Sequence, residues 1–146
     1  MFRRVLPPNK CTRSLLYGLL LFLVLSASLV AQDEAVAERY LSYALEAATE
    51  GRWLDAEATL ERAADFASYS SELSYYLALA RRKLGRPLGA VLEAVSRALE
   101  TSRWRTRGSD DARLLQAECL IDLRAYDGAL DSLRSCAEGA ETAYLR

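Results

Sequence analysis

The sequence has no histidine and only three cysteines among its 146 residues. Without histidine it lacks the most common general base and the most common metal ligand at neutral pH. The cysteines Cys11, Cys119 and Cys136 show no CxxC-type spacing, and nucleophile motifs and glycine-rich phosphate loops are missing as well. We therefore expect no metal, no cofactor and no enzymatic activity. Cys119 and Cys136 either form a disulfide in an oxidising compartment or fill small sites between helices.

Helix-breaking residues are also scarce, with three prolines and seven glycines. The composition leans instead toward alanine, leucine, glutamate and arginine, which favour helices. A chain of 146 residues is long enough for one ordinary domain or one short repeat array. The expected fold class is all-α.

Acidic residues are absent from the first part of the chain, where Asp33 is the earliest. Four of the 19 basic residues precede it, so the remaining 15 face all 20 acidic residues, and the later part carries a net charge of about −5. Binding of a polyanion usually requires a net basic face. Nucleic acid is therefore not an expected partner.

The first 31 residues have the pattern of an export leader. Residues 1–13 are basic, and residues 14–31 form a run of about 18 residues without charge. Small residues make cleavage after Ser28 or Ala31 plausible, which would release residues 32–146 as a periplasmic or secreted domain. Alternatively, residues 14–31 stay in the membrane as an anchor whose basic end remains in the cytoplasm. Both alternatives predict an exported domain.

Residues 32–146 contain an internal repeat, which shows in three similar segments at 51–60, 85–92 and 124–133. Their third positions are 34 and 39 residues apart. The same intervals separate the alanines of the segments that precede them, Ala44, Ala78 and Ala117. Each unit has the pattern of a helix, a short break and a second helix.

This pattern resembles the tetratricopeptide repeat (TPR), a 34-residue helical hairpin with small residues, a turn glycine and a turn aromatic at set positions. In the first unit those positions, together with one for a large apolar residue, hold Ala44, Gly51, Trp53, Ala56, Leu60 and Ala63. The resemblance implies a right-handed superhelix of about three antiparallel hairpins, at about residues 37–70, 71–109 and 110–143. Six helices are expected, with breaks near Gly51, Ser70, Gly85, Arg105 and Arg124. An unrelated antiparallel bundle is the alternative.

The resemblance also implies that a peptide or helix of a partner protein binds on the concave face. The residues at the corresponding positions include an apolar stripe and two cations: Leu41, Leu45, Tyr75, Leu79, Arg82, Lys83, Leu114 and Ile121. Tyr75 is expected to be an exposed anchor, and Arg82 and Lys83 are expected to attract acidic side chains of the partner. The alternative is that a neighbouring helix covers the stripe.

A second candidate surface is the loop that holds Arg103, Trp104, Arg105 and Arg107. Arginines interleaved with an exposed tryptophan can contact lipid headgroups or an acidic partner, although most basic loops are only solvated.

The expected function is that of an extracytoplasmic scaffold for protein–protein interaction. The alternatives are a membrane-anchored assembly subunit of an envelope complex and the N-terminal part of a longer repeat array. The sequence leaves the identity of the partner and the oligomeric state open.

The leader generates a first prediction, that the bulk of the chain lies outside the cytoplasm. Protease added to intact spheroplasts should degrade residues 32–146, whereas a variant that lacks residues 1–31 should stay protected inside the cell. Protection of the full chain would contradict export.

Overall fold

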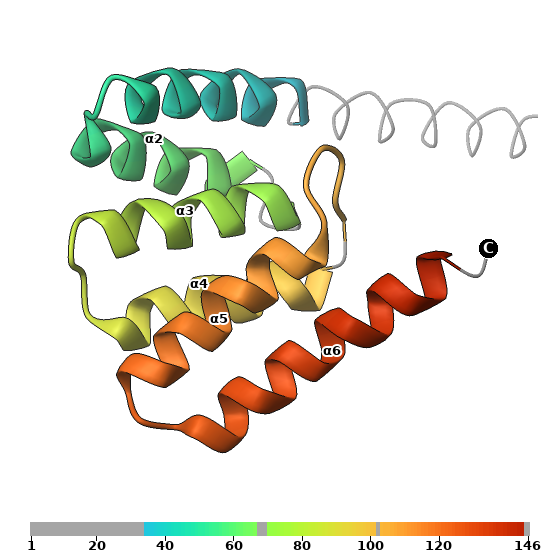
Figure 1. Cartoon of the computed structure of the whole chain (residues 1–146). Helices are drawn as coiled ribbons and strands as arrows, with labels where there is room; N and C mark the ends of the chain where they lie inside the picture. Colours follow the sequence, from blue (N-terminus) through green and yellow to red (C-terminus); the bar gives the residue numbers. More distant parts are fainter. Residues whose placement is uncertain (1–33, 67–69, 102, 145–146) are drawn as a thin grey trace, which may run out of the picture.

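The computed structural model of the chain describes residues 34–66, 70–101 and 103–144, and the predicted leader lies outside them. The described residues form six helices and no strand, which confirms the all-α fold class (Figure 1). A helix over residues 34–49 is followed by five others: α2 (Trp53–Phe66), α3 (Ser71–Lys83), α4 (Leu88–Thr101), α5 (Ser109–Asp122) and α6 (Tyr126–Tyr144). The expected breaks between helices are confirmed. None of the helices in these ranges is long and apolar enough to cross a membrane.

Each helix packs mainly against its neighbours in the sequence. The pairs in contact are α2 with α3, α3 with α4, α4 with α5, and α5 with α6. Figure 1 shows the helices in a row, with residues 34–49 at one end and α6 at the other. Such an arrangement is solenoid-like, because each helix contacts those next to it rather than one common centre.

Three of the turns share one backbone conformation, at Gly51, Gly85 and Arg124. Their φ angles are 78°, 66° and 60°, which lie in the left-handed region. In each turn the amide of the next residue donates to the carbonyl five residues earlier, with N···O distances of 2.8, 2.9 and 2.8 Å. This is the Schellman ending of a helix, which normally has glycine at the left-handed position. The third unit adopts it with an arginine, at some cost in backbone strain.

Alanines fill most of the contacts between helices. Ala44, Ala63 and Ala78 are each at most 1% exposed. Two clusters of buried residues result, one formed by residues 34–49, α2 and α3, and the other by α3, α4 and α5. Small side chains let helix axes approach closely, so the array is held by many short apolar contacts.

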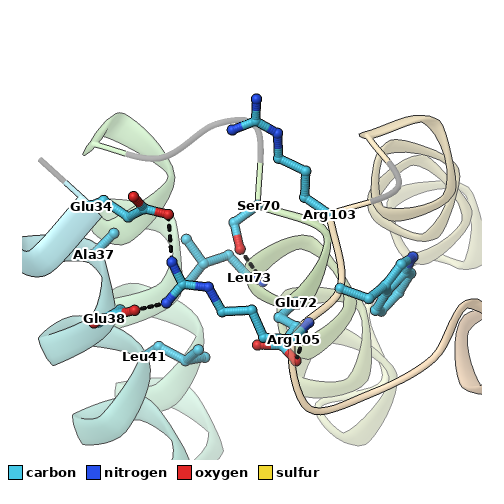
Figure 2. A pocket seen from close by; sticks show the side chains of 10 residues that line it. Glu34, Ala37, Glu38, Leu41, Ser70, Glu72, Leu73, Arg103 and Arg105 are labelled. Atoms are coloured by element: carbon cyan, nitrogen blue, oxygen red, sulfur yellow. Dashed lines mark hydrogen bonds and ion pairs between the residues drawn. The ribbon is translucent and has the colours of Figure 1, made fainter. Parts of the chain in front are cut away.

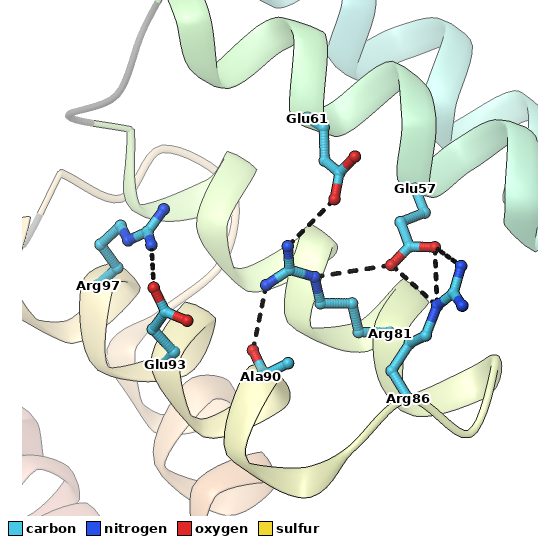
Figure 3. A network of polar contacts seen from close by, with 7 residues as sticks. All are labelled: Glu57, Glu61, Arg81, Arg86, Ala90, Glu93 and Arg97. Atoms are coloured by element: carbon cyan, nitrogen blue, oxygen red, sulfur yellow. Dashed lines mark hydrogen bonds and ion pairs between the residues drawn. The ribbon is translucent and has the colours of Figure 1, made fainter.

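A polar network ties the first hairpin to the second (Figure 3). The buried carboxylate of Glu57 on α2 accepts a hydrogen bond from Arg86 Nη2 at 2.7 Å and lies 3.6 Å from Arg81 Nε. Arg81 also pairs with Glu61 at 3.1 Å and donates to the Ala90 carbonyl at 3.2 Å. Because a buried carboxylate without partners would be costly, these contacts fix α2 against the α3–α4 turn.

The turn geometry predicts opposite effects for two substitutions. Gly51→Ala should lower the free energy of unfolding by about 1 kcal/mol, because an L-residue is strained at this φ. No atom lies within 4 Å of an added Cβ, so the loss is a backbone effect. Arg124→Gly should raise stability by a few tenths of a kcal/mol by removing the same strain. Urea unfolding measures both changes.

The matched control is Arg134→Gly, an exposed arginine inside α6. Glycine should cost about 1 kcal/mol there, as it does in other helix interiors. Equal destabilisation by Arg124→Gly and Arg134→Gly would show that the turn at residue 124 is not strained.

Candidate functional site

The clearest candidate site is an apolar groove formed by residues 34–49, α2 and α3. It has a volume of about 360 Å³. Its walls are Ala44, Leu45, Ala48, Thr49, Trp53, Ala56, Leu60, Tyr76, Leu79 and Ala80. No charged side chain lines it, and Thr49 and Tyr76 supply its polar side-chain groups. Volumes of this size are typical of sites that accept apolar groups.

Two residues of the predicted concave stripe, Leu45 and Leu79, lie in this groove. Both are half-buried, as expected for a wall that remains open. Leu41 lies one turn away along the first helix and lines a different cavity. The structure therefore brings together part of the predicted stripe.

The expectation that Tyr75 is an exposed anchor is wrong. Tyr75 is buried in the second core cluster, where its ring lies edge-on to Trp104 with centroids 6.2 Å apart. Burial is also the main reason why the pKa of Tyr75 is raised. The neighbouring Tyr76 takes the place in the groove instead. Successive helix positions differ by about 100°, so a small rotation of α3 decides which tyrosine is accessible.

The remaining predicted groove residues lie outside the groove. Arg82 on α3 pairs with Asp122 on α5, so its charge is already balanced. Lys83 is exposed at the end of α3. Leu114 and Ile121 are exposed on α5 and do not line the groove. The attraction expected between Arg82 and acidic partner side chains is thus weakened by an internal ion pair.

Trp53 and Tyr76 are groove residues that the sequence reasoning missed. Trp53 matched the turn aromatic of the repeat, a position associated with packing, and it does pack partly against the first core. Its spacing from Leu45 gave no sign that its remaining face would border a groove. Only the approach of α3, with Tyr76 and Leu79, closes the site.

A second cavity, of about 250 Å³, lies between the first helix, the start of α3 and the α4–α5 loop. Figure 2 shows Arg105 reaching from the loop to two carboxylates on the first helix. Arg105 Nη2 is 2.5 Å from Glu34 Oε1, and Nη1 pairs with Glu38. All three side chains are about half exposed, so solvent screens these ion pairs.

Glu72 anchors the same loop at the start of α3. Its carboxylate accepts hydrogen bonds from the backbone amides of Arg105, Thr106 and Arg107, and from the Thr106 hydroxyl at 2.7 Å. Burial would raise the pKa of Glu72, but these hydrogen bonds outweigh it and hold the pKa below its ordinary value. Next to Glu72, the buried Ser71 hydroxyl accepts from the Arg103 amide at 2.8 Å.

The basic loop is therefore not a freely exposed arginine–tryptophan surface. Trp104 is half-buried against the second core, which corrects the expectation that it is exposed. Arg107 pairs with Asp111 and donates to the Tyr76 hydroxyl at 3.4 Å. Arg103, Arg105 and Arg107 remain exposed, but two of them are engaged with carboxylates of the same chain.

Cys119 and Cys136 are free thiols. Cys119 is buried in the second core, where burial raises the pKa of its thiol. Cys136 donates to the Asp110 carbonyl at 3.8 Å. Both cysteines thus fill small sites at helix contacts, which is one of the two alternatives drawn from the sequence.

Compared with protein-family models and with curated proteins, the chain matches none. The argument for function below depends on the groove and on the repeat pattern.

The Glu72 contacts predict that the α4–α5 loop loosens when this carboxylate is weakened. Glu72→Gln should lower the free energy of unfolding by about 2 kcal/mol, because hydrogen bonds to a charged group are replaced by weaker ones. Glu93→Gln, on an exposed glutamate that pairs with Arg97, should change it by less than about 0.5 kcal/mol. In a Trp53→Phe background, only Glu72→Gln should shift the Trp104 emission to the red.

The pH dependence has a definite sign. Because the folded pKa of Glu72 is lowered, its stabilisation is present above the ordinary value of 4.5 and is lost as the pH falls through the folded value. The wild type should therefore lose more stability than Glu72→Gln on acidification below 4.5. Parallel losses in the two proteins would contradict the role of Glu72.

Proposed function

We propose that the chain is an extracytoplasmic scaffold that holds an apolar segment of a partner protein in the groove of Leu45, Trp53, Tyr76 and Leu79. The observation that carries the proposal is the groove itself, which is apolar, uncharged and open. A groove left uncovered by the protein's own helices favours binding of a partner over purely structural packing. The wall residues define the partner segment as one with large aliphatic or aromatic side chains.

We further propose that the helices form a right-handed superhelix of the TPR type. Three observations support it. The helices pack in sequence order, the repeat alanines Ala44, Ala78 and Ala117 are all buried, and three turns with the same left-handed ending recur in the 34- and 39-residue register. An unrelated bundle would not require the same ending at equivalent positions.

Recognition in this groove would depend on shape and apolar burial. The partner would contribute one or two large side chains to a space of about 360 Å³. Burial of each such side chain contributes about 1.5–3 kcal/mol before the costs of association. Arg82 contributes little to specificity, because Asp122 already neutralises it.

The extracytoplasmic location is supported by the basic residues 1–13 and the uncharged run at 14–31. With either a cleaved leader or a membrane anchor, the groove would meet partners of the cell envelope or the exterior.

Site-specific photocross-linking in living cells tests the groove. A benzophenone amino acid at position 45 or 79 of the full chain should cross-link to the same partner protein, through a segment rich in large apolar residues. Leu54 provides the matched control, because it is an exposed leucine on α2 outside the groove. The probe at position 54 should give no such product.

The dependence on the groove is tested by a second substitution. Leu79→Asp should abolish the cross-link formed from position 45 while the helical circular dichroism is unchanged, because a carboxylate in an apolar wall is costly to desolvate. A product that survives Leu79→Asp, or that forms equally from position 54, would place the partner elsewhere. Cross-linking from positions 103 and 105 alone would move the site to the α4–α5 loop.

A further inference from the structure

The last helix, α6, leaves an apolar stripe uncovered. It packs against α5, where an added Cβ at Gly128 would meet Leu120 Cδ1 at 3.4 Å and where Ala129 is buried. On an adjoining face, Tyr126 is 58%, Leu130 51% and Leu133 38% exposed. These three residues are spaced four and three positions apart, so they lie along one side of the helix.

The sequence continues this spacing to the end of α6. After Tyr126, Leu130 and Leu133, the alternating steps of four and three reach Ala137, Ala140 and Tyr144. An apolar stripe with this alternation is the pattern by which two helices pack along their length. The turn to the polar side is clear in the sequence as well, since Asp127, Asp131 and Arg134 occupy the intervening positions.

The order of large and small residues along the stripe is self-complementary. If two copies of α6 lie antiparallel and cross at residue 135, Leu133 of one faces position 137 of the other, and Leu130 faces position 140. Each leucine then meets an alanine, and Tyr126 meets Tyr144. Pairing of large with small residues lets two helices approach without voids or overlap. Parallel pairing would instead place leucine against leucine and alanine against alanine.

We propose that this face of α6 binds a second copy of the chain, forming a twofold symmetric, antiparallel α6–α6 pair. A twofold interface uses the same patch on both copies, as a self-complementary stripe requires. A helix of 19 residues is about 28 Å long. Two such helices in contact bury on the order of 1,000 Å², which is at the lower end of stable interfaces. The pair is therefore concentration-dependent.

Light scattering of the full chain in mild detergent tests the proposal. The wild type should have twice the monomer mass at about 100 µM, and Leu130→Asp should be a monomer at the same concentration. Leu114→Asp is the matched control, because Leu114 is an exposed leucine of similar exposure, 48%, on α5. It should remain a dimer.

All three proteins carry residues 1–33, so association through the leader would survive the substitution at position 130. A wild type that stays monomeric, or a Leu130→Asp variant that stays dimeric, would overturn the proposal. Helical circular dichroism checks that each variant is folded.

Disulfide trapping tests the antiparallel register without disturbing the stripe by a charge. In a Cys11→Ser, Cys136→Ser background, Leu133→Cys and Ala137→Cys are made as separate full-length proteins. An oxidised mixture of the two should contain the covalent dimer several-fold in excess over either protein alone. Rapid cross-linking of Leu133→Cys alone would indicate parallel pairing and overturn the proposal, as would the absence of cross-linking in the mixture.

Discussion

The structure depends on α3 being packed on two faces at once. Leu73, Leu77 and Ala80 belong to the first core, whereas Tyr75 and Ala78 belong to the second. The ring of Tyr76, between these faces, contacts both cores. A helix with a single apolar stripe could serve only one neighbour, so the double packing of α3 is what joins the hairpins into one array.

The ends of α3 are held by buried carboxylates that are satisfied from neighbouring units. Glu72 at its start receives the amides of the α4–α5 loop, and Glu57 on α2 receives the arginines near its end. A buried carboxylate without such partners would destabilise the fold by several kcal/mol. The same contacts that satisfy these charges therefore fix the α4–α5 loop and one edge of the groove.

The two proposed binding surfaces lie on different parts of the array. The groove is formed by the first three helices, and the exposed stripe lies on the last one. Their separation along the row of helices in Figure 1 means that pairing through α6 leaves the groove accessible. A paired array would present two grooves, and a partner with two apolar segments would gain in effective affinity from both.

The sequence by itself determined the helices and their endings, because these depend on residues a few positions apart. The composition, the apolar periodicity and the repeat spacing predicted six helices with breaks near Gly51, Gly85 and Arg124, and the structure confirms them. Leu45 and Leu79 were also placed correctly as neighbours in an open groove. Side-chain exposure was less predictable, because it depends on residues distant in the sequence.

Tyr75 and Trp104 show why only the tertiary structure decided these positions. The loop that carries Trp104 is drawn onto α3 by Glu72, a contact that spans more than 30 residues, and the indole then covers Tyr75. Arg82 is likewise neutralised by Asp122, 40 residues away. No local pattern encodes these contacts, since they form only when helices of different units pack at a particular rotation and distance.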